Sequence, residues 1–131
     1  MRTIQNKKLI IRSNGRLTRD YLYVDDAVNA YLLVLKKLLN SNNIKLLTYN
    51  VGSKYNLNVL NIVRMILKYM KKTHLSPIIK NNSKMELKTQ KLSYEKIIKE
   101  LNWKQDTNMK KGLNSTIEWY TKNFQYFYKK N

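Results

Sequence analysis

The chain alternates short apolar runs with longer stretches whose apolar residues recur at helical spacing. Strands are predicted at residues 9–11, 46–51 and 77–79, an extended segment at 21–24, and an extended segment or loop at 85–92. Helices are predicted from Asp25 or Asp26 to Leu39, at about 58–72, from Ser93 to Leu101, and at about 108–128. This alternation predicts the α/β class, or α+β for the chain in isolation.

Polar residues mark the ends of these helices. Asp25 or Asp26 is predicted to cap the first helix, because either carboxylate can accept a backbone N–H of the first turn. Ser93 is the predicted cap of the short helix, and Asn102 is its predicted left-handed stop. The last helix carries one apolar stripe, formed by Met109, Leu113, Ile117, Tyr120, Phe124 and Phe127.

Length and composition restrict the class of protein. With 131 residues, of which 43% are hydrophobic, the chain fits a single domain with a core of its own. The sequence has no cysteine, which excludes disulfides and Cys-ligated metals, and its one histidine, His74, excludes a His-rich site. No apolar run approaches the roughly 20 residues of a membrane span, and residues 1–6 lack a signal-peptide core. We therefore expect a cytoplasmic protein without a membrane partner.

The chain is strongly basic, with 26 Lys and Arg residues against 8 acidic ones and a net charge of +18. A charge of this size is typical of nucleic-acid-binding proteins, in which the basic residues form one patch. Here paired lysines fall in different predicted elements, at residues 36–37, 71–72, 110–111 and 129–130. We therefore expect only non-specific, salt-sensitive binding to nucleic acid.

The sequence contains no complete catalytic pattern. Gly15, Gly52 and Gly112 are too far apart to form a glycine-rich loop around a dinucleotide. The spacing of Tyr126 and Lys130 matches a Tyr-x-x-x-Lys pair, but its place at the end of the last helix favours chance.

Titratable residues outside these patterns have simpler interpretations. His74 lies in the polar turn after a predicted helix, which favours a surface residue over a catalytic one. Asp20, Asp25 and Asp26 could form a Mg²⁺ or acid/base cluster, but caps and turns are the favoured roles.

Four motifs occur in a defined order along the chain. They are IIRSNGRLTRDYLYVDDAV at residues 10–28, YNVG at 49–52, KELNW at 99–103 and GLNSTIEWY at 112–120. Together they resemble the C-terminal part of the extended short-chain dehydrogenases, the NAD-dependent nucleotide-sugar epimerases and dehydratases. The resemblance covers residues from about 9 to 124, and the stretch 86–93 is most similar to the CDP-glucose 4,6-dehydratase branch.

The resemblance implies that residues 1–131 form a single partial domain, the C-terminal substrate-binding lobe of such an enzyme. In the family, an N-terminal Rossmann half carries the NAD loop and a catalytic Tyr-x-x-x-Lys pair, and this sequence does not contain them. NAD is therefore expected in the complete enzyme and not on this chain alone. The complete enzyme is expected to oxidise C4 of a sugar transiently, followed by water elimination or reprotonation. Expected partners are a CDP-, dTDP- or UDP-hexose, and a separately encoded Rossmann half or a second copy of the chain.

The resemblance also implies five substrate-binding residues and no catalytic, cofactor-binding or metal-binding ones. Arg19 matches an arginine that contacts the nucleotide diphosphate, a role in which the planar guanidinium donates two charge-assisted hydrogen bonds. Arg12 matches a position that lines the nucleotide pocket, and Asn50 matches the asparagine of the Y-N-x-G motif. Lys88 and Gln90 fall near a further contact, where the family pattern has Arg or His in place of lysine.

Two alternatives stay open. Arg19 could instead form a salt bridge with Asp20 or Asp25 at the junction of strand and helix. The whole chain could be a small basic binding protein for nucleic acid or a protein partner, without catalysis. Trp103 and Trp119 are predicted to be packing residues in both cases.

Overall fold

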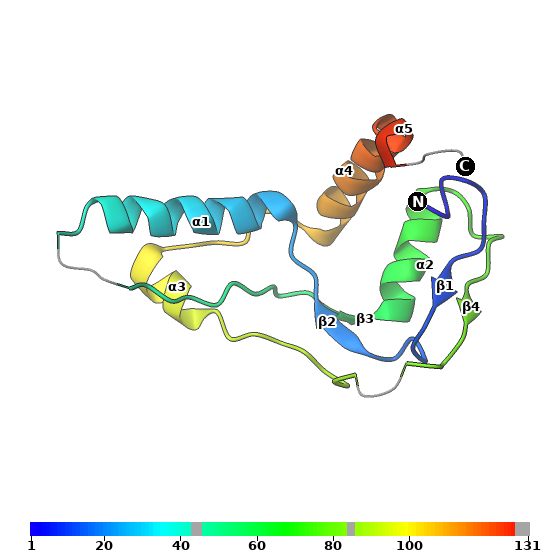
Figure 1. Cartoon of the computed structure of the whole chain (residues 1–131), viewed down its shortest axis with the longest axis horizontal. Coiled ribbons are helices and arrows are strands. Elements are labelled where there is room, and N and C mark those ends of the chain that lie inside the picture. Colours follow the sequence, from blue (N-terminus) through cyan, green and yellow to red (C-terminus); the bar gives the residue numbers. More distant parts are fainter. Residues whose placement is uncertain (43–45, 84–85, 128–131) are drawn as a thin grey trace.

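The computed structural model describes residues 1–42, 46–83 and 86–127. In this part of the chain, short strands pair in twos between longer helices (Figure 1). The elements are β1 (Ile10–Ile11), β2 (Thr18–Asp20), α1 (Val24–Leu39), β3 (Asn56–Asn58), α2 (Val59–Tyr69), β4 (Ile78–Ile79), α3 (Glu95–Leu101), α4 (Met109–Lys122) and α5 (Phe124–Phe127). α1 and α3 lie together at one end of the molecule, and α2 lies at the other end beside β1 and β4.

Strand pairing joins segments that are far apart in the sequence. β1 and β4 pair in parallel, with Ile10 opposite Ile78. β2 and β3 pair antiparallel, with Thr18 opposite Asn58. Thr18 also forms an isolated parallel bridge with Thr89. The mixture of helices with parallel and antiparallel pairs agrees with the predicted α/β class.

Two apolar clusters form the core. The first consists of Ile11, Val63, Leu67 and Leu75. The second consists of Ala30, Ile97 and Trp103. Trp103 is completely buried, and its Nε1 donates to the carbonyl of Asp26 at 3.1 Å, which confirms its predicted packing role. Trp119 is 52% exposed and packs against the rings of Tyr120 and Phe127, so it is a packing residue at the surface rather than in the core.

The predicted strand at residues 46–51 is absent from the structure. A strand requires a neighbour that completes its backbone hydrogen bonds, and among the described residues no strand pairs with this segment. Tyr49 and Val51 instead pack against the second core cluster, and the carbonyl of Thr48 accepts a hydrogen bond from Lys96 Nζ at 3.0 Å. Side-chain burial therefore holds the segment in place without a sheet.

The predicted caps are partly right. Asn102 has a φ of 53° and ends α3 in the left-handed conformation, as expected. The N-cap of α1 is Tyr23, without a side-chain hydrogen bond, so the prediction that Asp25 or Asp26 caps this helix is wrong. Ser93 is not the cap of α3 either, because Tyr94 occupies that position.

Element boundaries differ from the predictions in two further places. An extended segment was predicted at residues 21–24, but the strand in this region is β2, which lies earlier in the chain. Its residues Thr18–Asp20 pair with β3. The predicted helix at 108–128 ends at Asn123, whose side-chain amide donates to the carbonyl of Trp119 at 2.9 Å, and α5 follows; residue 128 lies outside the described part. Within that described part, no helix is long and apolar enough to cross a membrane.

Candidate functional site

The segment that follows β4 runs beside the segment that leads from β1 to β2 (Figure 1). The amide of Asn82 donates to the carbonyl of Arg12 at 2.8 Å, and the amide of Thr18 donates to that of Lys88 at 3.0 Å. The amide of Gln90 donates back to the carbonyl of Thr18 at 3.1 Å. We call these two hydrogen-bonded segments, residues 12–20 and the described residues of 80–92, the ladder. Four of the five predicted substrate-binding residues lie on it: Arg12, Arg19, Lys88 and Gln90.

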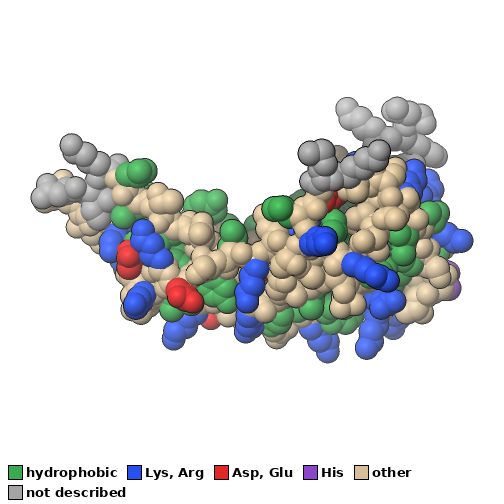
Figure 2. Space-filling model, turned by 90° about the horizontal axis from the view of Figure 1, so that it is seen from below, with side chains coloured by type: hydrophobic (Ala, Val, Ile, Leu, Met, Phe, Trp, Pro, Cys, Tyr) green, Lys and Arg blue, Asp and Glu red, His purple; other side chains and the backbone are tan. Residues whose placement is uncertain are grey.

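Basic side chains are spread over the face of the molecule that Figure 2 shows. Figure 2 shows Lys and Arg side chains across the whole visible face, interleaved with hydrophobic and uncharged ones. Among the predicted site residues, Arg12, Lys88 and Gln90 are exposed. The ladder therefore presents the cations of Arg12 and Lys88 to solvent.

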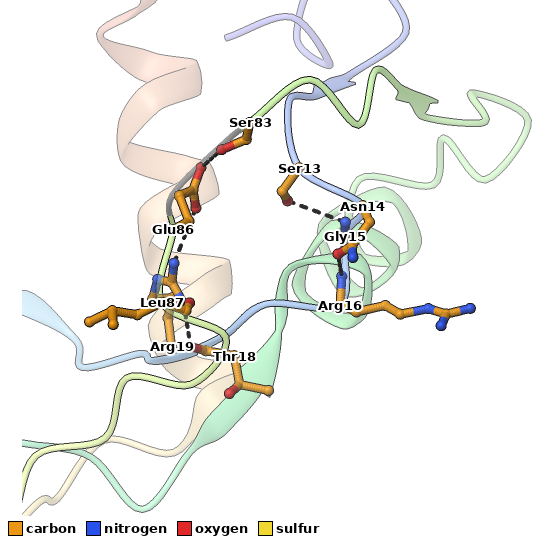
Figure 3. Close-up of polar contacts among 9 residues, drawn as sticks. All are labelled: Ser13, Asn14, Gly15, Arg16, Thr18, Arg19, Ser83, Glu86 and Leu87. Carbon is orange, nitrogen blue, oxygen red and sulfur yellow. Dashed lines mark hydrogen bonds and ion pairs between the residues drawn. The ribbon is translucent and has the colours of Figure 1, made fainter.

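The guanidinium of Arg19 is fixed by both segments of the ladder (Figure 3). Its Nη1 donates to the carbonyl of Thr18 at 2.7 Å and to that of Leu87 at 2.9 Å. Its Nη2 donates to Oε2 of Glu86 at 3.1 Å. The side chain remains 25% exposed, so this anchored cation can be reached from solvent.

Glu86 is a functional candidate that the sequence analysis missed. Its Oε1 accepts a hydrogen bond from the hydroxyl of Ser83, and its Oε2 pairs with Arg19 (Figure 3). The sequence feature that could have indicated it is that Glu86 is the only acidic residue between Asp26 and Glu95. An isolated carboxylate in a strongly basic chain has many possible cations, and only the fold shows which one it meets.

Asp20 secures the far end of the ladder. Its carboxylate accepts hydrogen bonds from Asn56 Nδ2 at 2.9 Å and from the amide of Leu92 at 2.8 Å. The alternative prediction, an ion pair of Arg19 with Asp20 or Asp25, is therefore wrong, because the acidic partner of Arg19 is Glu86. Successive side chains of a strand point to opposite faces, which separates Arg19 from its neighbour Asp20.

A tight turn precedes β2 and carries two side-chain-to-backbone hydrogen bonds. The amide of Gly15 donates to Ser13 Oγ at 3.2 Å, and the amide of Arg16 donates to Asn14 Oδ1 at 2.9 Å. Gly15 has a φ of 77°, a conformation that favours glycine. Figure 3 shows that the side chain of Arg16 points away from Arg19, although only two residues separate them in the sequence.

Asn50 lies outside the ladder. It is exposed and lines a hollow beside α1. Gly52, two residues further on, packs against the end of the ladder, where an added Cβ would lie 3.0 Å from the carbonyl oxygen of Leu92. The structure thus brings four of the predicted residues onto one ladder and leaves Asn50 on the adjacent segment.

The positive charge of Arg19 influences a neighbouring phenol. Burial raises the pKa of Tyr21 above its ordinary value of 10.0, and the charge of Arg19 opposes part of that increase. The charge of Arg19 thus favours the ionised form of this phenol, but the effect of burial is larger.

None of the three glycines lies in an open phosphate cradle. A Cβ added at Gly15 would meet the side chain of Leu60 at 2.5 Å, and one at Gly52 would meet Tyr94 at 2.6 Å. Gly112 packs against Tyr23 in the same way. Side chains thus fill the space that a phosphate cradle would leave open. The described residues also contain no group of three or more His, Asp or Glu side chains that could hold a metal ion.

Comparisons with known proteins show the family to which the chain belongs. A family model described as GDP-mannose 4,6 dehydratase matches residues 1–116. The dTDP-D-glucose 4,6-dehydratase of Homo sapiens is 30% identical over 130 residues, a match that covers 91% of this chain and 34% of the human protein. The chain thus spans about a third of the length of this curated relative.

Solved structures share the fold. UDP-glucose 4-epimerase from Thermotoga maritima, determined with UDP-glucose, has a TM-score of 0.78 and 26% identity, covering 94% of this chain and 38% of that one. The dTDP-glucose 4,6-dehydratase of Bacillus anthracis, in complex with NAD, has a TM-score of 0.78 and 23% identity, covering 95% and 38%. These matches confirm the predicted fold class and do not favour the alternative of a small basic binding protein without catalysis. The chain belongs to the GDP-mannose 4,6 dehydratase family, within the nucleotide-sugar dehydratases and epimerases that its motifs resemble.

Proposed function

We propose that this chain binds the nucleotide diphosphate of a sugar substrate, as part of a 4,6-dehydratase or epimerase of its family. The observation that carries the proposal is the anchored guanidinium of Arg19. Two backbone carbonyls hold it in place while part of it stays open to solvent, so little side-chain entropy is lost when an anion binds. A guanidinium held in this way is suited to paired hydrogen bonds with phosphate oxygens.

The other four residues are proposed to complete the site. Lys88 supplies a second cation, and Gln90 supplies an amide on the same segment of the ladder. Arg12 contributes a further cation from the opposite segment, and Asn50 supplies an amide from the neighbouring one. Support comes from the backbone hydrogen bonds that align the two segments and from the family motif around Asn50.

The complete protein is proposed to be cytoplasmic and to use NAD for hydride transfer at the sugar. The three glycines of this chain are packed against side chains, so NAD is proposed to bind to a Rossmann half rather than to residues 1–131. The role proposed for this chain is substrate binding. Residues 1–131 are proposed to be one partial domain that pairs with a Rossmann half or with a second copy. The candidate substrates are CDP-, dTDP- and UDP-hexoses. The similarity of residues 86–93 to the CDP-glucose 4,6-dehydratase branch supports a CDP-hexose. The matched relatives are named as enzymes of dTDP-glucose and UDP-glucose, which supports the other two.

Titration of the full chain with CDP-, dTDP- and UDP-glucose tests the proposal. Arg19→Ala should weaken binding of the preferred nucleotide-sugar by about 1.5–3 kcal/mol, the range for a hydrogen bond to a charged group. Arg16→Ala is the matched control, because it removes the same charge from the same segment but from a side chain that points away (Figure 3). It should leave the affinity nearly unchanged. Equal losses in the two variants would reduce the effect to general electrostatics and overturn the proposal.

A parallel titration with random DNA separates the proposal from the alternative of a basic binding protein. Arg19 is one of 26 cations, so Arg19→Ala should hardly alter DNA affinity. The slope of log K against log salt should change by at most about one contact. Loss of tight, base-selective DNA binding, with nucleotide-sugar affinity intact, would favour the basic binding protein instead.

A further inference from the structure

Arg19 already has an anionic partner inside the chain. Its Nη1 donates to two carbonyls, while its Nη2 donates to the carboxylate of Glu86 at 3.1 Å. The carbonyl contacts are neutral, so Glu86 is the group that competes with an incoming anion for the charge. We infer that Glu86 is a built-in competitor, which occupies Arg19 until a diphosphate displaces it. This inference rests on the proposed function of Arg19.

The burial of the two partners favours displacement of the carboxylate rather than of the guanidinium. The side chain of Glu86 is 44% exposed and that of Arg19 is 25% exposed. When Glu86 leaves, water can replace its contacts, whereas the carbonyls of Thr18 and Leu87 continue to hold Arg19. The cation therefore stays in position for the ligand.

The position of Glu86 in the sequence and in the fold directs its carboxylate to Arg19. It is the only acidic residue between Asp26 and Glu95, and it lies on the ladder two residues before Lys88. Its hydrogen bond from Ser83 holds the carboxylate on the side of the ladder where Arg19 lies (Figure 3). Because this carboxylate has to leave before an anion can bind, Glu86 lowers the affinity of Arg19 for every phosphate ligand by the same factor.

Calorimetric titration of the full chain with UDP and UMP tests this role. Glu86→Gln should bind UDP about two- to fivefold more tightly, the factor that corresponds to a partly exposed ion pair. The gain should be the same for UMP, so the ratio of UMP to UDP dissociation constants should stay constant. Glu118→Gln is the matched control, because Glu118 also forms an ion pair, with Lys122 at 2.8 Å on α4, and its loss changes the net charge equally.

A double-mutant cycle separates competition from general charge effects. In the Arg19→Ala background, Glu86→Gln should give no gain beyond that of Glu118→Gln, because the competed cation is gone. If Glu86→Gln binds UDP equally or more weakly while Arg19→Ala still loses affinity, Glu86 positions Arg19 and the inference is wrong. If Arg19→Ala binds UDP as the unmodified chain does, the proposed function of Arg19 fails, and the inference fails with it.

Discussion

The hydroxyl of Tyr49 donates to Oε2 of Glu100 at 2.6 Å and connects the segment after α1 to α3. This hydrogen bond, with desolvation and the charge of Glu100, raises the pKa of Tyr49 above its ordinary value of 10.0. A pKa that is raised in the folded state means that the contact stabilises the fold at neutral pH. This stabilisation is lost as the pH rises through the folded-state pKa. Tyr49→Phe should therefore cost more stability at neutral than at strongly alkaline pH.

Urea unfolding of both proteins at about pH 8 and about pH 11 measures this difference. The gap between their free energies of unfolding should shrink at the higher pH. Tyr126→Phe serves as the control, because Tyr126 is 73% exposed, and the difference in its free energy of unfolding should stay constant between the two pH values. A Tyr49→Phe penalty that is equal at both pH values would contradict the prediction.

At the residue scale, the motifs single out five substrate-binding residues, which stay a prediction, and they do not indicate what these side chains contact. Arg19 was singled out through its motif, yet its carboxylate partner lies 67 residues away. Glu86 carries no local signal of that pairing, because strand register between distant segments depends on the whole fold. The tripeptide around Arg19 offered Asp20 as the obvious partner, and strand alternation rules that contact out.

At the scale of elements, Asp26 ties the start of α1 to the segment that precedes α4. Asp26 is 4% exposed, and its Oδ1 accepts hydrogen bonds from the amides of Asp106 at 3.0 Å and Thr107 at 3.2 Å. Asp26→Ala should destabilise the fold by about 1–3 kcal/mol, because it leaves these amides without their acceptor. Asp26→Asn keeps an oxygen at the same position and should cost less.

Urea unfolding of the two variants measures both effects. The exposed neighbour Asp25 provides the control, since Asp25→Ala removes only a favourable charge from the first turn of α1. That loss should be about 0.3–1 kcal/mol. If Asp25→Ala costs as much as Asp26→Ala, the link between α1 and the α4 segment does not contribute as the hydrogen bonds indicate.

Helices were predicted more accurately than strands. α2 and α4 begin where an asparagine precedes an apolar stripe, and the side chains of Asn58 and Asn108 accept amide hydrogen bonds at 2.8 and 2.9 Å. Such caps and stripes are local and can be read from neighbouring residues. The apolar run at 46–51 has strand composition, but a strand also needs a partner, which local composition does not contain.

At the scale of the whole molecule, α1 presents an apolar stripe to solvent. The stripe consists of Val24, Val28, Tyr31, Leu32, Leu35 and Leu39, which are between 48% and 76% exposed. Contiguous apolar surface of this kind marks an interaction site or an aggregation liability. We expect the chain to self-associate or to bind a hydrophobic dye at micromolar concentration.

Leu32→Glu should reduce both effects, because it places a charge in the middle of the stripe. Asn29→Glu is the matched control, since it adds the same charge to an exposed position of α1 that is not part of the stripe. Sedimentation velocity over a range of concentrations measures the association, and dye fluorescence measures the exposed apolar surface. A monomeric wild-type chain with a sharp cooperative melt and no dye binding would contradict the prediction.

The ladder also imposes an order on events during synthesis. The carbonyl of Leu87 that binds Arg19 lies 68 residues further along the chain. At about 5–20 residues per second, Arg19 emerges from the ribosome about 3–14 s before this partner. α1 and α2 can form from local contacts in that interval, whereas the ladder must wait for a long loop to close, which slows folding. The guanidinium is therefore without its carbonyl and carboxylate partners early in the life of the chain, and the proposed anion site can form only after the loop has closed.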